Sequence, residues 1–184
     1  MKKWKLLKSE DVSPSKWFPV LKQKLELPDG KIVDDFYISP LGNVVIILPV
    51  TKEKEFVFVK QFKNGVNEIM IECPGGNVQK GKTLVESALA ELEEEVGIKT
   101  SSENLKLITK IASNPTKTNH ISYCYIAFDL EINSVQKFDS TENIEIVKVT
   151  PKKALEMVNS GEIIVGDSVA LINKAYFLYP ELFK

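Results

Sequence analysis

The residues best suited to chemistry are glutamates crowded near the end of one predicted helix. They fall shortly before Gly97: Glu91, Glu93, Glu94 and Glu95. The i,i+3 and i,i+4 spacings place Glu91, Glu94 and Glu95 on one arc of the helix. Carboxylates so placed repel one another and oppose the helix dipole, so stability alone does not favour them. Because a bound divalent cation reverses both penalties, the cluster predicts a site for Mg²⁺, or alternatively Mn²⁺.

The helix that carries these acids has clear ends. Thr83 followed by Glu86 is the pattern of a capping box, and Gly97 stands where a helix ends in left-handed geometry. At roughly 100° per residue, one narrow stripe of the helix is apolar. We expect this stripe to face the core: Val85, Ala88, Leu89, Leu92 and Val96. Glu95 borders the stripe, so it should be the least solvated of the clustered acids.

A loop rich in glycine and lysine, GGNVQKGK at residues 75–82, precedes the helix. A cation held beside such a loop can bridge phosphate oxygens, polarise phosphorus and lower the pKa of a bound water. The simplest alternative is an acidic face that only contacts solvent. The two alternatives differ in whether a divalent metal stabilises the protein.

Residues 76–98 resemble the Nudix box of the Nudix hydrolases, which reads Gly, five residues, Glu, seven residues, Arg-Glu, apolar, any, Glu-Glu, any, Gly, apolar. The matching positions are Gly76, Glu91, Leu92, Glu94, Glu95, Gly97 and Ile98. Lys82 replaces the first glutamate of the motif, and Ala90 replaces the arginine. The resemblance implies an α/β/α sandwich with a mixed sheet and a metal-dependent hydrolase. Because both members of the Glu-Arg pair are absent, a catalytically weak or inactive nucleotide-binding module is the alternative.

The resemblance also implies which residues hold the metal. Glu91, Glu94 and Glu95 correspond to the metal-binding glutamates of the family, and Glu94 is assigned a catalytic role as well. Gly75 takes the place whose backbone carbonyl helps to hold a metal in similar enzymes.

Motifs outside the box bring the resemblance closest to the ADP-ribose pyrophosphatase-like branch, which hydrolyses nucleotide sugars. The counterparts are LPDG at 27–30, KQFK at 60–63, IECPGG at 71–76 and the segment 141–163. This branch implies hydrolysis of the pyrophosphate bond of a nucleoside diphosphate derivative, such as ADP-ribose or a nucleotide sugar. The products would be a nucleoside monophosphate and a sugar phosphate. A homodimer is implied as well.

Four further residues receive substrate-binding roles from this resemblance. Lys63 replaces a family arginine that contacts a phosphate, and a lysine can still do so as a point charge. Trp17 and Phe36 resemble aromatic residues that sandwich the nucleobase, although ordinary packing would also explain them. Pro115 lies in a loop that borders the terminal sugar of the substrate in related proteins.

Glu142 stands where related enzymes carry the glutamate that activates the attacking water. A general base must come within hydrogen-bond reach of that water, and a loop residue can do so. Asp139 and Glu145 are the alternatives for this role. His120, the single histidine, is expected to have a structural or surface role, since it cannot form a catalytic triad without an accompanying nucleophile motif.

The elements that must position these residues are mostly strands. Pro28-Asp29-Gly30 indicates a hairpin, so residues 1–43 should form an antiparallel β-region that contributes to the dimer and to substrate binding. Residues 44–184 should form the hydrolase domain. Along the sequence, strands precede and follow the acidic helix, and two further helices are expected over 151–161 and 167–179. Regular β-α alternation is absent, which argues against a doubly wound parallel sheet.

The composition is that of an ordinary globular protein. The 184 residues include 24 basic and 25 acidic ones, for a net charge of −1, so no overall basic field attracts nucleic acid. Apolar runs such as residues 44–50 fall far short of the roughly 20 residues needed to cross a bilayer. The basic N-terminus lacks the apolar core of a signal peptide. We therefore expect a cytoplasmic protein without membrane or nucleic-acid partners.

Cys73 and Cys124 both lie in apolar, strand-like segments. We expect two buried, reduced thiols, since a buried free cysteine behaves as a small hydrophobic residue. A structural zinc site needs about four ligands, which one histidine and two separated cysteines cannot supply.

Overall fold

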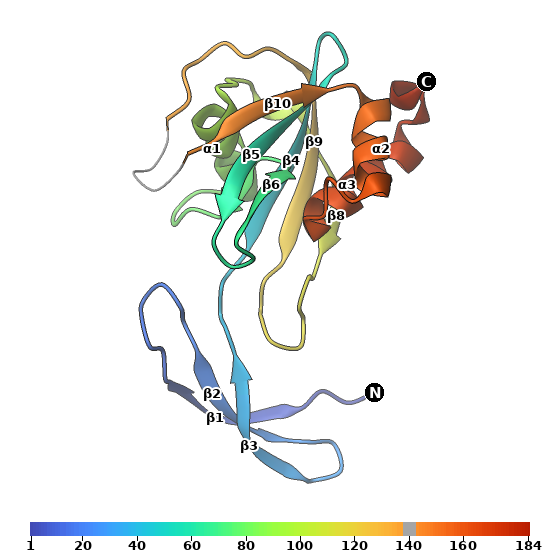
Figure 1. Ribbon diagram of the computed structural model, residues 1–184. Coiled ribbons are helices and arrows are strands. Elements are labelled where there is room, and N and C mark those ends of the chain that lie inside the picture. The colour runs from blue at the N-terminus through green and yellow to red at the C-terminus, as the bar shows by residue number, and fades with distance from the viewer. Residues whose placement is uncertain (138–142) are drawn as a thin grey trace. The chain divides into compact units, whose positions relative to one another are not determined.

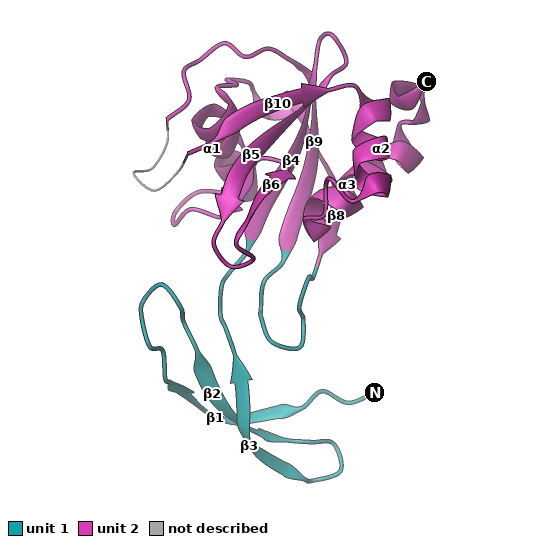
Figure 2. Ribbon diagram, viewed as in Figure 1, with its two compact units in different colours: residues 1–43, 112–121 teal, residues 44–111, 122–184 magenta. Residues whose placement is uncertain are grey.

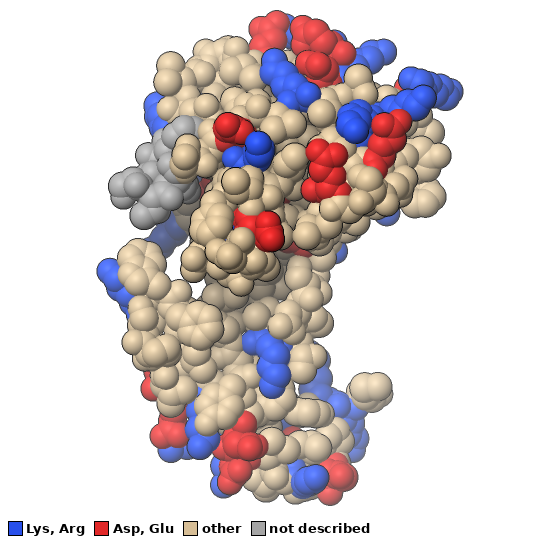
Figure 3. All heavy atoms as spheres, in the orientation of Figure 1, with Lys and Arg blue, Asp and Glu red and all other residues tan. Residues whose placement is uncertain are grey.

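The structure, a computed structural model, describes residues 1–137 and 143–184 (Figure 1). In this part of the chain, no helix combines the length and the apolar character that crossing a membrane requires. On the face drawn in Figure 3, acidic and basic side chains intermix, and neither sign of charge forms a continuous field.

The chain divides into two compact units (Figure 2). The first unit contains residues 1–43 together with 112–121, and the second contains residues 44–111 and 122–184. The inclusion of residues 112–121 in the first unit is not evident from the sequence, because these residues are distant along the chain from the N-terminal region.

The first unit is built on an antiparallel sheet in the order β1-β2-β3. Its strands are β1 (Lys5–Asp11), β2 (Leu21–Glu26) and β3 (Ile32–Ile38). The β2–β3 hairpin turns where the sequence predicts it. Gly30 has a φ of 86°, which glycine adopts without steric cost, and its N–H donates to the Leu27 carbonyl at 2.9 Å. The predicted antiparallel N-terminal β-region is confirmed.

Residues 112–121 attach to this sheet through hydrogen bonds at its end. The Ser39 N–H donates to the Lys117 carbonyl at 2.7 Å, and the Gly42 N–H donates to Oδ1 of Asn119 at 3.1 Å. The Lys117 ammonium lies 4.5 Å from the centroid of the Phe36 ring, a favourable cation–π distance. These contacts explain why the loop groups with the N-terminal strands.

The second unit contains a mixed sheet in the order β10-β5-β4-β9-β8, with β6 paired to β5 and β7 paired to β4. The strands are β4 (Val44–Thr51), β5 (Phe56–Lys63), β6 (Glu68–Glu72), β7 (Gly75–Asn77), β8 (Leu105–Ile111), β9 (Ser122–Leu130) and β10 (Glu145–Val149). The central pair, β4 and β9, is parallel, whereas the other pairings are antiparallel. A mixed sheet was predicted and is confirmed.

Helices cover the sheet on both faces (Figure 1). They are α1 (Leu84–Val96), α2 (Pro151–Ser160) and α3 (Gly166–Leu178), with short 3₁₀ turns at Ser102–Asn104 and Pro180–Phe183. Side chains alternate along each central strand: in β5, Phe56 and Phe58 join the core under α2 and α3, whereas Val57 and Val59 join the core under α1. The predicted α/β/α sandwich is the observed architecture.

Both cysteines are free and buried in the second unit, as predicted. Burial raises the pKa of the Cys73 thiol well above its usual range and raises the pKa of Cys124 to about 12. Both groups therefore stay protonated at pH 8, and the reactive thiolate is scarce. We expect a thiol reagent at pH 8 to label neither cysteine in the folded protein and both after denaturation. Rapid labelling of the folded protein would contradict this description of the core.

Candidate active site

Helix α1 has the ends that its sequence predicts. Thr83 caps the N-terminus: its hydroxyl accepts from the Glu86 N–H at 3.2 Å, and the Glu86 carboxylate accepts from the Thr83 N–H at 2.7 Å. At the other end, Gly97 adopts left-handed geometry with a φ of 66°, and its N–H donates to the Glu93 carbonyl. A side chain at Gly97 would also collide with the Ser134 carbonyl oxygen. The helix is therefore fixed in length and register.

The apolar side of α1 sets the direction in which its acids point. Ala88, Leu92 and Val96 are fully buried against the sheet. Leu89, which the sequence places on the same stripe, is only half-buried and lies outside this cluster, whereas Leu84 packs against it. The buried side is thus rotated toward Leu84, and Glu91, Glu94 and Glu95 emerge beside it.

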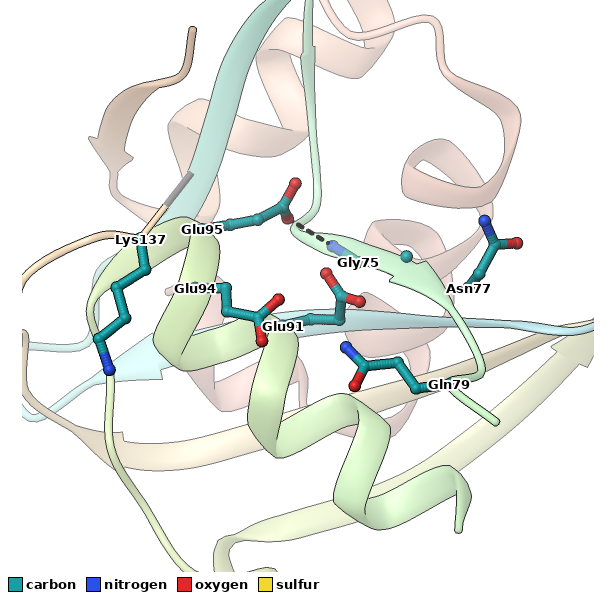
Figure 4. Close-up of a pocket in the computed structure, with 8 residues that line it drawn as sticks. Gly75, Asn77, Gln79, Glu91, Glu94, Glu95 and Lys137 are labelled. Atoms are coloured by element: carbon teal, nitrogen blue, oxygen red, sulfur yellow. Dashed lines mark hydrogen bonds between the residues drawn. The ribbon is translucent and has the colours of Figure 1, made fainter. Parts of the chain in front are cut away.

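These three acids line one pocket of about 280 Å³ between α1 and strand β7 with the turn that follows it (Figure 4). Residues 75–77, which the sequence places in a loop, form β7 and pair with β4. The pocket is formed by Gly75, Gly76, Asn77, Gln79, Glu91, Glu94, Glu95 and Lys137. The structure therefore brings together the predicted metal-binding glutamates and Gly75. It adds Asn77 and Gln79, which the adjacent loop sequence could have indicated, and Lys137, for which no local sequence signal exists.

Glu95 is the most deeply buried acid of this pocket. Its side chain is buried, with the residue only 6 % exposed, and its carboxylate accepts a hydrogen bond from the Gly75 N–H at 2.8 Å (Figure 4). Glu91 and Glu94 are half-buried. The prediction that Glu95 is the least solvated acid is confirmed, and the contact with Gly75 ties the helix to the glycine loop.

The two glycines are required by close approach. A Cβ atom at Gly76 would lie 2.6 to 2.8 Å from the carboxylate atoms of Glu91. A Cβ atom at Gly75 would collide with the Val45 carbonyl oxygen, because β7 pairs with β4 at this point. Both distances are shorter than real Cβ contacts. The absence of a side chain at Gly76 therefore creates the space that the Glu91 carboxylate occupies, and the absence of one at Gly75 permits the close pairing of β7 with β4.

The donor set of the pocket suits a hard divalent cation, because Mg²⁺ and Mn²⁺ prefer carboxylate and carbonyl oxygens. Within residues 1–137 and 143–184, no three His, Cys, Asp or Glu side chains already stand close enough to share one ion. Side-chain rotation about staggered torsions would therefore accompany metal binding. The types of the donors, and their place in one pocket, fit a divalent metal.

The two positions that depart from the Nudix box do not line this pocket. Lys82 is exposed in the turn before α1, where its N–H donates to the Gln79 carbonyl at 3.0 Å. Ala90 is half-buried on α1. Their replacement leaves the carboxylate-lined pocket in place.

Lys63 lies on β5, outside the acidic pocket. Its ammonium is 2.5 Å from the Glu72 carboxylate, which also accepts a hydrogen bond from Gln61 at 2.9 Å. Glu72 immediately precedes the Cys73-Pro74 segment that leads into the glycine loop. Lys63 is thus held by an ion pair near the start of this loop.

The other predicted substrate-binding residues belong to the first unit. Trp17 is 82 % exposed. Phe36 makes an edge-to-face contact with Trp4 at 5.8 Å between ring centroids. Pro115 is exposed in the 112–121 loop, and His120 is half-buried in the same loop.

Three acids are candidates for the general base: Glu142, Asp139 and Glu145. Glu142 and Asp139 lie outside the described residues. Glu145 begins β10, is exposed, and pairs with Lys60 at 3.2 Å. It lines a separate pocket on β5 and β6 together with Asn143.

Comparisons with known proteins agree with this geometry. The family model for the NUDIX domain matches residues 40–164, and the model for the nucleoside diphosphate sugar hydrolase N-terminal domain matches residues 4–39. The ADP-ribose pyrophosphatase of Bacillus subtilis (strain 168) is 30 % identical over 160 residues, covering 86 % of this chain and 85 % of that protein. The methanol dehydrogenase activator of Bacillus methanolicus is 26 % identical over 181 residues, covering 98 % and 95 %.

A solved structure described as an ADP compounds hydrolase superposes with a TM-score of 0.85 at 20 % identity. The superposition covers 98 % of this chain and 96 % of the other chain, and it supports the assignment of the fold. The NUDIX model alone spans more than half of the chain. The chain therefore belongs to the Nudix family and is a Nudix hydrolase.

Proposed function

We propose that the protein hydrolyses the pyrophosphate bond of a nucleoside diphosphate derivative, ADP-ribose or a nucleotide sugar, in a reaction that depends on Mg²⁺ or Mn²⁺. The products are a nucleoside monophosphate and a sugar phosphate. One observation carries the proposal: three carboxylates line one pocket beside Gly75 and Gly76 of strand β7. The similarity to a protein named ADP-ribose pyrophosphatase supports the choice of substrate class.

Glu91, Glu94 and Glu95 would hold the metal, assisted by the Gly75 carbonyl. When bound, a divalent ion neutralises the diphosphate and activates water as a nucleophile. The hydrogen bond from the Gly75 N–H orients the Glu95 carboxylate before any ion arrives. The buried side chains of Leu92 and Val96 fix the helix behind it.

Glu142 is our first choice for the base that takes a proton from the attacking water, and Asp139 is an alternative. Glu145 is a weaker alternative, because its carboxylate pairs with Lys60 and lines a different pocket. Glu94 would contribute to catalysis as one of the three carboxylates that hold the metal.

Lys63 would bind a phosphate group of the substrate once it leaves Glu72. Trp17 and Phe36 would contact the nucleobase, and Pro115 would border the terminal sugar. The exposure of Trp17 supports this role, because an exposed indole is accessible for stacking. The Lys16 ammonium lies 4.7 Å from the centroid of this ring.

We also propose a homodimer to which residues 1–43 contribute. Large apolar side chains are exposed in this region, which supports an interface there: Trp4, Leu6, Trp17 and Phe18.

The alternative function is a nucleotide-binding module with little or no turnover. The departures at Lys82, Ala90 and Lys63 favour it, and one relative is named an activator rather than a hydrolase. A panel of nucleoside diphosphate derivatives, assayed with Mg²⁺ or Mn²⁺, separates the two functions. Release of a nucleoside monophosphate supports the enzyme, whereas calorimetric binding without product supports the module.

Metal binding should stabilise the folded protein. At Mg²⁺ concentrations of about 100 times the dissociation constant, the gain is about 2.7 kcal/mol, which corresponds to a rise in Tm of roughly 5 to 10 °C for a chain of this size. Differential scanning fluorimetry with and without Mg²⁺ measures the shift. An unchanged Tm at all Mg²⁺ and Mn²⁺ concentrations would favour an acidic helix with no metal site.

A further inference from the structure

The end of α1 that carries the acids is capped by a distant part of the chain, residues 133–137, here called the capping segment. The last carbonyls of a helix have no donors within the helix. The Lys137 N–H donates to the Glu94 carbonyl at 2.9 Å, and the Gln136 side-chain amide donates to the Glu95 carbonyl. These two carbonyls belong to residues whose side chains line the acidic pocket.

The capping segment is itself anchored just beyond the helix. The N–H groups of Asn133 and Ser134 both donate to the Gly97 carbonyl, at 3.0 and 2.9 Å. The Asn133 side chain accepts from the Lys99 N–H at 2.8 Å and donates to the Lys99 carbonyl at 3.1 Å. The segment is thereby held in register along the helix end, and Gly97 permits its close approach.

Electrostatics give the capping segment a second effect. Helix α1 has no basic residue in its last turn, although three glutamates add to the negative end of its dipole there. The Lys137 ammonium lies 2.7 Å from the Glu93 carboxylate, which Lys99 also approaches at 3.3 Å. The hydrogen bond from Lys137 lowers the pKa of Glu93. The segment thus supplies donors and a cation where α1 lacks them.

We propose that Gln136 is a positioning residue for the metal site, acting through the Glu95 backbone carbonyl to fix the direction of the Glu95 carboxylate. The inference rests on the proposed function, in which Glu95 binds the metal. Glu95 is held at two points: the Gly75 N–H donates to its side-chain carboxylate, and the Gln136 amide donates to its backbone carbonyl, which fixes the Cα from which the side chain projects. Loss of one such contact behind a metal ligand typically costs 10- to 100-fold in metal affinity or activity.

The test is Gln136→Met, which removes the amide donor while keeping the length of the side chain. We expect the Mg²⁺ concentration for half-maximal activity to rise about tenfold, while kcat at saturating Mg²⁺ and the Tm without metal change little. Gln136→Glu should raise the Mg²⁺ concentration for half-maximal activity further, because a carboxylate would face the Glu95 carbonyl. Lys99→Met is the matched control: it removes the other cation on Glu93 but leaves the Gln136 contact intact, so the Mg²⁺ dependence should stay at the wild-type value.

The outcomes separate this inference from the proposed function. An unchanged Mg²⁺ dependence in both Gln136 variants, beside a wild type that needs Mg²⁺, overturns the inference alone. An equal shift in Lys99→Met would also overturn it, because the Mg²⁺ dependence would then respond to any change at this end of α1 rather than to the Gln136 contact. A wild type with no metal-dependent hydrolysis overturns the proposed function and this inference together.

Discussion

Replacing Glu95 by glutamine is expected to lower kcat about 10³-fold while the protein stays folded. Glutamine keeps the size of the side chain, and its amide oxygen can still accept the hydrogen bond that the Gly75 N–H makes to Glu95. What disappears is the negative charge in a pocket proposed to hold a divalent cation. Metal stabilisation of a transition state is worth several kcal/mol, and a loss of about 4 kcal/mol corresponds to about 10³-fold in rate.

Glu93→Gln provides the matched control on the same helix. Glu93 lies outside the pocket and pairs with Lys99 and Lys137, and such exposed pairs contribute about 0 to 1 kcal/mol. We expect activity within about fivefold of wild type, since about 1 kcal/mol corresponds to about fivefold in rate. Steady-state kinetics on both variants measures kcat, and circular dichroism checks that both stay folded. Full activity in Glu95→Gln would show that the acidic cluster is not the metal site.

Gly76→Ala is expected to lower kcat/KM about 10²-fold with little loss of stability. A Cβ atom at this position would meet the Glu91 carboxylate at 2.6 to 2.8 Å. The end of a flexible side chain can move away at low cost, so folding should tolerate the change. The carboxylate would then leave its place in the pocket, and a misplacement of about 1 Å can cost about 10²-fold in rate.

Gly65→Ala is the control for this variant, because nothing lies within 4 Å of the added Cβ atom and the backbone has no positive φ. Its activity and melting temperature should match wild type. If Gly76→Ala kept wild-type kinetics, the position of the Glu91 carboxylate would be irrelevant to turnover, which contradicts its role as a metal ligand.

The sequence predicts the acidic pocket well because its determinants are local. The capping box at Thr83, the left-handed end at Gly97 and the spacing of the glutamates all lie within one helix and its flanks. The β5 and β9 strands are apolar on both faces and therefore indicate a covered sheet. These local patterns are sufficient to predict the bounds of the helix, its buried side and the α/β/α sandwich.

The contacts missed from the sequence join residues far apart in the chain. Gln136 and Lys137 reach the end of α1 from 41 and 43 residues away, and no local pattern marks them. The same holds for residues 112–121, which join the N-terminal sheet. Leu89 shows a different failure, because the buried side of α1 is rotated toward Leu84 and leaves Leu89 half-buried outside the core cluster.

The departures from the family pattern at Lys63, Lys82 and Ala90 are weak evidence against activity. All 24 basic residues of this chain are lysines, and it contains no arginine. Lys63 therefore follows the composition of the whole chain rather than a specific loss. Ala90 and Lys82 lie outside the pocket, so their effect on catalysis would have to pass through α1.

The most direct test of the central claim is product release by the purified protein with ADP-ribose and a panel of nucleotide sugars, in Mg²⁺ and in excess chelator. We expect one or more substrates to yield a nucleoside monophosphate and a sugar phosphate in equal amounts with Mg²⁺ or Mn²⁺, and no product in chelator. Equal product in chelator, or no product from any substrate with either metal, would contradict a metal-dependent hydrolase.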